Sequence, residues 1–417
     1  MKENELETMR KSFKTANDRT NHIMKEPKSL ELKEKVQNIR KDSINNNEEL
    51  YKTACESFKR NGIDSFFAST IEDAQDKIVD LIKENAEDED LSGVTVTKSK
   101  SNTLREIKIE DCLDEYGVNF LATDLGDRIL QIKEGYNIPI HPTCPAAHLD
   151  VHEIANVINN SEMNVHVEDD AHEIMQAVKK DVLNQMKDSD VGISGANSIA
   201  AEDGSIILIH NEGNINHVIS KKLHIVVAGI DKLVPSIEDA ISVAKLETIY
   251  ATGSHVTSYM NIVSGPSKTA DIEKKLFKNM YGAEKVVVIF LDNGRSKAFN
   301  ECLWCVGCGN CVTVCPVYNV IGSDFGYENY VGGRGVAFSD FIGDHDTSLK
   351  SGLFKCTLCG ICTENCPVSL PTNAIIEQLR ANNNDLGIFL EPHSLIKDKI
   401  KDHIPNCSTP TDFNKYL

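Results

Sequence analysis

Cys305-Val-Gly-Cys308-Gly-Asn-Cys311-Val-Thr-Val-Cys315-Pro316 is a run of four cysteines that recurs downstream as Cys356-Thr-Leu-Cys359-Gly-Ile-Cys362-Thr-Glu-Asn-Cys366-Pro367. Each copy has the spacing C-x2-C-x2-C-x3-C-P, which is typical of thiolates that hold iron–sulfur clusters. Three cysteines two residues apart can wrap one cluster, whereas the cysteine before proline normally binds the other cluster. We therefore predict two [4Fe–4S] clusters. The expected ligands are Cys305, Cys308, Cys311 and Cys366 for the first, and Cys356, Cys359, Cys362 and Cys315 for the second.

Structural zinc is the alternative, because paired C-x2-C knuckles also form tetrahedral thiolate sites. Zinc sites usually draw ligands from two separated pairs, whereas each run here places four cysteines within eleven positions and ends in Cys-Pro. The spacing therefore favours iron–sulfur clusters. Cys302 extends the first run by one more C-x2-C step and could replace a neighbouring ligand, but the four later cysteines have the complete spacing.

Length and charge restrict the class of protein. With 417 residues the chain is long enough for two or more domains with a buried core. A formal net charge of −19 argues against nucleic acid and anionic membranes as partners. The longest apolar run, Val286 to Leu291, is too short for membrane insertion, and residues 1–10 are charged rather than signal-like. Eight of the thirteen cysteines fit the two motifs, which indicates a reducing, cytoplasmic setting.

Helices and strands alternate in the middle of the chain. Apolar positions recur at helical spacing over residues 71–82 and 174–186, and Val94 and Val96 alternate as in a strand. Further strands are predicted at 191–193, 206–209, 225–227 and 286–291. The last two are apolar enough to be central strands covered on both faces. This pattern predicts an α/β layer fold.

Composition divides the chain into three parts. Residues 1–50 are polar and lack a sustained apolar stripe, so we expect a helical but loosely packed N-terminal region. Residues 51–296 should form the α/β domain, because glycines and cysteines replace β-branched runs after Asn293-Gly294. Residues 297–417 should form a C-terminal domain that holds both cysteine motifs.

The C-terminal domain is expected to be helical. Forty residues separate Cys315 from Cys356, which is long for a ferredoxin built from hairpins and resembles the α-helical ferredoxin modules of respiratory iron–sulfur subunits. A helix over Pro371 to Arg380 is predicted to pack beneath the second cluster. Its expected inward residues are Ala374, Ile375, Gln378 and Leu379.

Three polar, glycine-bearing segments, 97–101, 192–197 and 210–214, follow or end predicted strands. Ligands of α/β sheets bind at strand ends, and lysines, hydroxyls and free backbone amides suit an anionic ligand. Ordinary turn chemistry is the alternative, because Gly, Asn and Ser dominate turns. The candidate ligand-binding residues are Lys98, Ser99, Lys100, Ser101, Ser194, Gly195, Asn197 and Glu212.

Taken together, these segments resemble the LUD domain family. The resemblance is carried by Lys98-Ser-Lys-Ser101, Thr123-Asp-Leu-Gly126, Val191-Gly-Ile-Ser-Gly-Ala-Asn197, Asn211-Glu-Gly-Asn214, Gly229-Ile-Asp-Lys-Leu-Val-Pro235 and Leu291-Asp-Asn-Gly-Arg295. A LUD domain followed by paired ferredoxin motifs is similar to the iron–sulfur subunit of L-lactate utilisation. The resemblance spans about residues 50 to 370.

The resemblance implies a LUD domain similar to the fold shared by sugar-phosphate isomerases and coenzyme A transferases. It also implies a complex with a cysteine-rich redox subunit and a second LUD protein, which oxidises L-lactate or a related 2-hydroxy acid to pyruvate. In such an oxidoreductase this chain would relay electrons through its clusters, and the LUD site would take a small anionic substrate.

One departure from the sequence pattern of the LUD family keeps a second interpretation of the function open. The arginine usual shortly after the Asn-Glu-Gly-Asn motif is replaced around Ile215-Asn216-His217, which removes a candidate carboxylate clamp. The alternative is a LUD-domain enzyme or adaptor that acts on another anionic substrate or with a heterodisulfide-reductase-like partner. Its clusters would then be a relay or a sensor, and Lys98, Lys100 and Glu212 its working groups.

Four histidines close together in the sequence raise the question of a metal site: His141, His148, His152 and His166. Only His148 and His152 have the i, i+4 spacing of a zinc helix, and no carboxylate pattern accompanies the others. We therefore expect surface or capping residues here.

Overall fold

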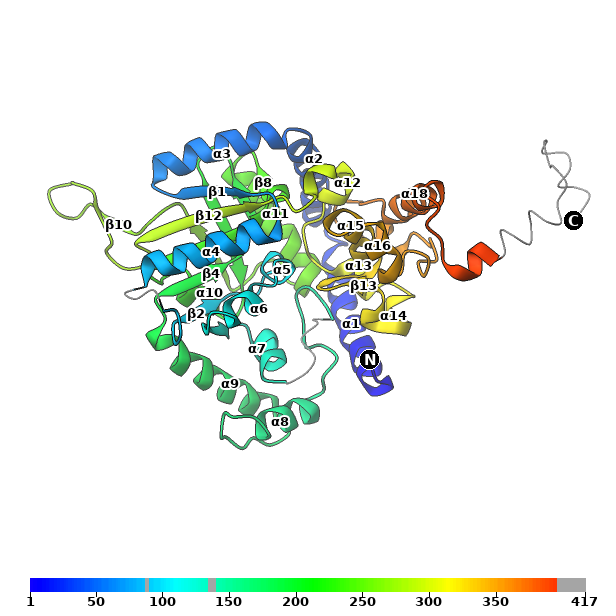
Figure 1. The fold of residues 1–417 in the computed structure, drawn as a ribbon, viewed down its shortest axis with the longest axis horizontal. Coiled ribbons are helices and arrows are strands. Elements are labelled where there is room, and N and C mark those ends of the chain that lie inside the picture. The colour runs from blue at the N-terminus through cyan, green and yellow to red at the C-terminus, as the bar shows by residue number, and fades with distance from the viewer. Residues whose placement is uncertain (87–89, 134–139, 396–417) are drawn as a thin grey trace, which may run out of the picture.

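The computed structural model describes residues 1–86, 90–133 and 140–395 (Figure 1). The end of the expected C-terminal domain, residues 396–417, lies outside the described residues. Within the described ranges, no helix combines the length and the apolar character needed to cross a membrane.

A six-stranded parallel sheet forms the centre of the α/β part, with the strand order β1-β12-β7-β4-β2-β3. The strands are β1 (Asp64–Ala68), β12 (Lys285–Leu291), β7 (Leu223–Gly229), β4 (Val191–Ser194), β2 (Thr95–Lys98) and β3 (Asn119–Ala122). β7 and β12 are interior strands, as their continuous apolar runs predicted. Because all strands are parallel, their carboxyl ends meet along one edge of the sheet.

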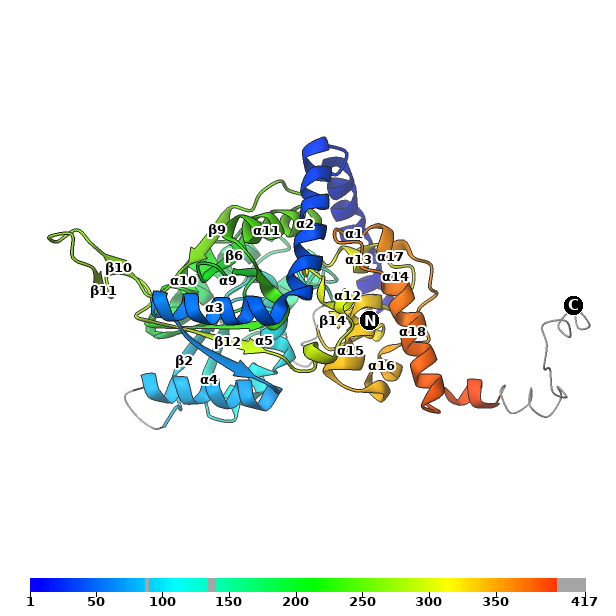
Figure 2. The same ribbon diagram turned by 90° about the horizontal axis from the view of Figure 1, so that it is seen from above.

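Helices cover both faces of this sheet (Figures 1 and 2). One face packs against α4 (Ile71–Asn85), α5 (Asn102–Glu106) and α6 (Ile109–Asp114). The other face packs against α3 (Asn47–Asn61) and α10 (Asn214–Val218), together with a second sheet. A further apolar cluster beside β3 holds α7 (Leu125–Ile132), α8 (Val151–Asn159) and α9 (Ala171–Gln185). The predicted α/β fold is confirmed.

The second sheet has four strands in the order β8-β5-β6-β9. They are β8 (Leu233–Val234), β5 (Ser198–Ala200), β6 (Ser205–His210) and β9 (Tyr259–Val263). α11 (Ile237–Thr252) packs on β5 and β6. Beyond β9, the short antiparallel pair β10 (Lys268–Thr269) and β11 (Phe277–Lys278) projects from the body of the molecule (Figure 1).

The N-terminal helices are packed more tightly than their polar composition predicted. α1 (Glu3–Ile23) buries Met9 and Phe13, and α2 (Pro27–Asn45) buries Val36. Both helices contact α11 on one side and the cysteine-bearing segment on the other. The expectation of loose packing is therefore wrong, because a few widely spaced apolar residues are enough when two neighbouring layers cover them.

The C-terminal region is helical, as expected for an α-helical ferredoxin domain. Its helices are α12 (Asn300–Leu303), α13 (Asn310–Thr313), α14 (Tyr318–Ile321), α15 (Gly332–Ile342), α16 (His345–Ser351), α17 (Ile361–Glu364) and α18 (Thr372–Asp385). A two-stranded pair, β13 (Gly326–Tyr327) and β14 (Tyr330–Val331), precedes α15.

The inward face of α18 differs from the predicted one. Ile375 and Leu379 are buried as expected, but Ile376 completes this face, while Ala374 and Gln378 are exposed. The i, i+1, i+4 spacing of the three buried residues turns the inward face away from the two exposed ones.

Candidate functional site

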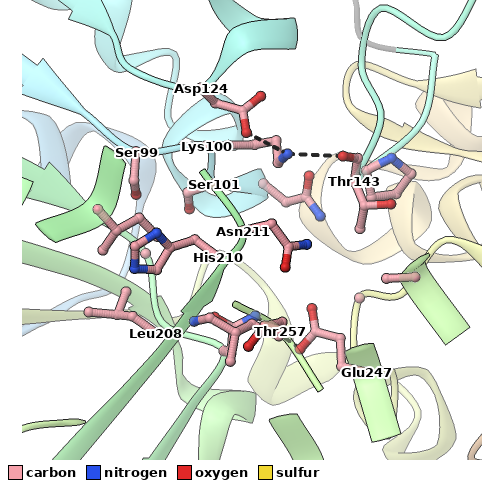
Figure 3. Close-up of a pocket in the computed structure, with 18 of the residues that line it drawn as sticks. Ser99, Lys100, Ser101, Asp124, Thr143, Leu208, His210, Asn211, Glu247 and Thr257 are labelled. Atoms are coloured by element: carbon pink, nitrogen blue, oxygen red, sulfur yellow. Dashed lines mark hydrogen bonds and ion pairs between the residues drawn. The ribbon is translucent and has the colours of Figure 1, made fainter. Parts of the chain in front are cut away.

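A cavity of about 310 Å³ lies at the carboxyl ends of the strands. Its walls come from the segments that follow β2, β4 and β6, and from Asp124, which follows β3 (Figure 3). Carboxyl ends of parallel strands are where α/β sheets bind ligands, and the volume is that of a small-molecule site.

Six of the eight candidate residues line this cavity: Ser99, Lys100, Ser101, Gly195, Asn197 and Glu212. The Lys100 ammonium donates to Oδ2 of Asp124 at 2.8 Å and to the carbonyl oxygen of Thr143 at 2.9 Å (Figure 3). Burial opposes the charge, but the Asp124 and Asp127 carboxylates outweigh it and raise the pKa of Lys100. Lys100 is therefore a cation at the cavity wall.

Gly195 and Ser101 bring two walls of the cavity close together. Ser101 is the N-cap residue of α5, and its Oγ accepts a hydrogen bond from the Leu104 amide at 3.3 Å. A Cβ on Gly195 would lie 2.4 Å from that Oγ, so only glycine allows this approach. Asn197 is held at both ends of its amide, since Nδ2 donates to Glu247 at 3.0 Å and Oδ1 accepts from the Ile209 amide at 3.0 Å.

The other two candidates, Lys98 and Ser194, lie behind the cavity wall. The Lys98 ammonium is buried and paired with the Glu110 carboxylate and, at 3.4 Å, with Asp127. Ser194 is fully buried, and its Oγ is hydrogen-bonded to Nε2 of His224 at 2.8 Å. Side chains on a strand alternate between its two faces, so neighbours of cavity residues can point into the core instead. Neither Lys98 nor Ser194 lines the cavity, in contrast to the expectation that both contact a ligand there.

Two buried polar oxygens on the cavity wall have no hydrogen-bond partner among the described residues: Oγ of Ser99 and Oδ1 of Asn214. Ser99 is only 1% exposed. The Asn214 amide is oriented by its other end, because Nδ2 donates to Oγ1 of Thr123 at 3.2 Å. Buried polar groups are nearly always paired, so these atoms suit the polar groups of a ligand.

Two carboxyl groups at the cavity hold protons more tightly than usual. Loss of hydration, together with the nearby Asp124 carboxylate, raises the pKa of Glu212 to about 7. The Leu125 amide donates to Oε2 of Glu212 at 3.0 Å. Burial raises the pKa of Glu247, although Lys232 opposes the shift. Glu212 can therefore take up or release a proton near neutral pH.

Sequence reasoning missed Asp124, His210, Lys232 and Glu247, which all line the cavity. Asp124 and Lys232 lie inside segments that carry the LUD resemblance, so that resemblance could have pointed to them. Glu247 lies on α11 with no local motif, and only the packing of that helix brings it to the cavity.

The cluster cysteines border two other cavities. The first is lined by Cys305, Cys308, Cys311 and Cys366, and the second by Cys315, Cys356, Cys359 and Cys362. Cys362 also borders the first cavity. None of the eight forms a disulfide. The fold thus brings the last cysteine of each run to the first three cysteines of the other run.

The loop that carries the first run turns tightly beside His141. Gly309 has a φ of 77°, and a Cβ there would lie 2.4 Å from the His141 ring, so the loop can turn this tightly only with glycine. Each thiolate of a [4Fe–4S] cluster binds a different iron, so the ligands surround a volume instead of converging on one point. Among the described residues, no three His, Cys, Asp or Glu side chains are grouped to hold a lone metal ion.

Cys302 lines neither cysteine cavity. It lies on α12 in the apolar core and is 1% exposed. Its carbonyl oxygen accepts a hydrogen bond from Arg334 at 3.4 Å. This position does not favour Cys302 as a replacement ligand.

The polar cavity and the first cysteine cavity are neighbours. Gly307, between Cys305 and Cys308, lines the polar cavity. A smaller cavity of about 70 Å³ runs beside it and is bordered by Lys232, Gly307, Cys305 and Cys311. A Cβ on Gly307 would lie 3.7 Å from Oε1 of Glu247, which places this carboxyl at the same boundary.

A buried ionic network joins the two parts of the chain at this boundary. Arg295 donates to both oxygens of Glu106 at 2.8 and 2.7 Å, and its Nε donates to Asp231 at 2.9 Å. The Tyr330 hydroxyl, from β14, also donates to Glu106. From α2, the Arg40 guanidinium donates to the carbonyl oxygens of Asp231 and Leu303, at 2.7 and 2.6 Å. These contacts hold the cysteine loops at a fixed distance from the cavity.

The four histidines do not share one environment. His152 and His166 are exposed, as expected. His141 and His148 are 4% and 1% exposed, so neither is a surface residue. His141 instead caps the backbone, since its Nδ1 accepts hydrogen bonds from the Thr143 and Cys144 amides at 3.2 and 3.3 Å. His141 Nε2 is 3.1 Å from the Gly309 carbonyl oxygen, and burial lowers the pKa of both rings to about 4. The ring of His141 lies 5.4 Å from the ring of Phe13 on α1, and the Tyr318 hydroxyl donates to the neighbouring Ile140 carbonyl oxygen at 2.6 Å.

Comparison with known proteins agrees with this two-part construction. The family model of the LUD domain matches residues 51–291, and that of a 4Fe-4S dicluster domain matches residues 301–370. A lactate utilization protein B from Bacillus cytotoxicus is 31% identical over 351 residues, covering 83% of this chain and 70% of the relative. Its counterpart from Anoxybacillus flavithermus is 32% identical over 343 residues, covering 81% and 69%.

Among solved structures, a DUF162 family protein from Deinococcus radiodurans is 13% identical, with a TM-score of 0.27. The match covers 59% of this chain and 98% of that protein. The family models account for both the parallel-sheet part and the cysteine-bearing part of the chain. The chain therefore belongs to the lactate utilization protein B family, in which a LUD domain is joined to a 4Fe-4S dicluster domain.

Proposed function

We propose that this chain is the iron–sulfur electron-transfer subunit of a complex that oxidises L-lactate, or a related 2-hydroxy acid, to pyruvate. The observation that supports this most is the small cavity that lies between the other two: it shares Lys232 and Gly307 with the polar cavity, and Cys305 and Cys311 with the first cysteine cavity. A ligand in the polar cavity would lie next to the loop that carries Cys305 and Cys308. The names of the relatives support lactate as the substrate.

Two [4Fe–4S] clusters are proposed, with Cys305, Cys308, Cys311 and Cys366 holding one and Cys356, Cys359, Cys362 and Cys315 the other. When bound, such clusters supply one-electron transfer. Each proposed ligand set contains one buried thiol, Cys308 in the first and Cys315 in the second, whereas Cys359 of the second set is exposed. Cys359 is therefore the ligand that a partner would reach most easily. The proposed partners are a cysteine-rich redox subunit and a second LUD protein.

The LUD cavity is proposed to bind the anionic ligand. Lys100 and Lys232 provide positive charge, and the Ser99 hydroxyl provides a buried donor. Glu212, with a pKa near 7, can accept the proton that a hydroxyl group loses when it becomes a carbonyl.

The proposal is tested with the chain co-purified with its partners. Cys359→Ser should lower the iron content from about eight atoms per chain and abolish lactate-dependent dye reduction. Cys302→Ser is the matched control, since this thiol lines neither cysteine cavity, and it should retain both properties. Dye reduction that survives Cys359→Ser would contradict the electron-transfer role.

A further inference from the structure

The two-stranded projection beyond β9 is an apolar and basic arm, which we define as residues 264–283. Ile272, Leu276 and Tyr281 are 64%, 65% and 82% exposed. The arm holds four lysines and two acidic residues, a net charge of +2, whereas the whole chain carries −19, so the remainder carries −21. An exposed apolar surface of this kind usually marks an interaction site.

The arm has little to stabilise it within one chain. β10 and β11 share two residue pairs, Lys268 with Lys278 and Thr269 with Phe277. Like charges directly opposite each other destabilise a hairpin, and an isolated hairpin is marginal in water. A partner that covers the apolar residues and neutralises the lysines would supply the missing stability.

A complementary surface lies beside the root of the arm. Gly265 packs on the end of α3, since a Cβ there would lie 2.7 Å from the Asn61 carbonyl oxygen, and α3 leads directly into β1. Among the described strands, β1 lies at the edge of the sheet and pairs with β12 alone. Phe66 and Phe67 on β1 are 37% and 50% exposed. An open edge with exposed apolar side chains is a site where another chain can dock.

The charge of this surface is opposite to that of the arm. α4, which contacts β1, carries five acidic and two basic residues. Arm and edge are therefore complementary in charge, and both expose apolar residues. They also lie at the end of the molecule away from the cysteine motifs (Figures 1 and 2).

We propose that the arm of one copy docks along the β1 edge of a second copy, and that the second copy returns the same contact. A two-fold dimer requires that each copy offer both halves of the contact, side by side, and the arm root lies next to β1. The dimer leaves the exposed surface around Cys359 free. It is independent of the function proposed for the cavity and the clusters.

The experiment measures the mass of the iron-loaded chain by light scattering at low salt. The expected mass is about 92 kDa, twice the 46.2 kDa of one chain. Leu276→Glu combined with Tyr281→Glu in the arm, or Phe67→Ser at the edge, should each give the mass of one chain. Val320→Glu is the matched control: Val320 is 64% exposed on α14, far from the arm, and its variant should stay dimeric.

Mixing the two monomeric variants decides whether arm and edge bind each other. In a mixed dimer, the intact arm of the Phe67→Ser chain meets the intact edge of the Leu276→Glu, Tyr281→Glu chain, so one of the two contacts survives. Dimer should therefore reappear on mixing and weaken as salt is raised. If Phe67→Ser fails to fold, judged by its iron content, Phe66→Ser replaces it. A monomeric wild type, dimeric arm or edge variants, or no dimer on mixing would each overturn the proposal.

Discussion

Replacing Ser99 by alanine should stabilise the protein and weaken ligand binding at the same time. The Ser99 Oγ is buried at 1% exposure and has no hydrogen-bond partner among the described residues. Leaving a buried hydroxyl unsatisfied costs about 1–3 kcal/mol, and Ser99→Ala removes that cost. We expect the free energy of unfolding to rise by about 1 kcal/mol, at the lower end of that range.

The effect on the ligand has the opposite sign. A hydrogen bond from Ser99 to a carboxylate contributes about 1.5–3 kcal/mol, so pyruvate should bind about 10- to 150-fold more weakly to Ser99→Ala. Calorimetric titration with pyruvate measures the affinity, and the melting temperature at a fixed scan rate measures the change in stability.

A matched control is Ser57→Ala on α3. Ser57 is also fully buried, but its Oγ is hydrogen-bonded to the Ala201 carbonyl oxygen at 2.7 Å. Its loss leaves that acceptor unpaired, so Ser57→Ala should lower the melting temperature and leave pyruvate affinity unchanged. A Ser99→Ala variant that melts below the wild type, or that binds pyruvate equally well, would refute the reasoning.

Three further predictions concern buried ionisable side chains. Arg295→Met leaves the Glu106 and Asp231 carboxylates buried without the Arg295 cation, which should lower the free energy of unfolding by about 3–5 kcal/mol in urea titrations. The double variant Arg295→Met, Glu106→Gln should recover part of the lost stability. Burial lowers the pKa of His148 to about 4 in the folded chain, so the unfolded chain binds more protons between pH 4 and 6.5. The stability of the protein should therefore fall as the pH drops through that range. His148→Leu should flatten this pH dependence in melting curves, and an unchanged slope would contradict the prediction. The pKa of Glu212 is raised to about 7, so pyruvate should bind more weakly as pH rises from 6 to 8, whereas Glu212→Gln should show no such dependence in the same calorimetric titrations.

Local patterns predicted the elements of the fold well. The apolar runs that became β7 and β12 are interior strands, and the helical spacing over residues 71–82 became α4. These predictions succeeded because burial on one or two faces of an element leaves a period in the sequence. Prediction failed where burial depends on a neighbour: α1 and α2 are polar overall but are covered by α11 and by the cysteine region.

The candidate site shows the same division. Polar residues after strands identified six cavity residues, because strand ends of a parallel sheet share one edge. Lys98 and Ser194 stand beside cavity residues in the sequence but point into the core. Glu247 lies on α11 with no local motif, and only tertiary packing brings it to the cavity.

The sequence by itself determined the donor atoms and their spacing: eight thiols in two runs, each ending in Cys-Pro, and the polar segments after the strands. Thiolate chemistry needs particular residues at short, fixed separations, and such separations are visible in a linear chain. Tertiary structure alone decided that the loop at Gly307 forms a wall of the LUD cavity, and that buried Arg295 and Arg40 hold it there. Contacts between residues about 190 positions apart, such as Arg295 with Glu106, leave no periodic trace, because they depend on how whole layers pack against one another.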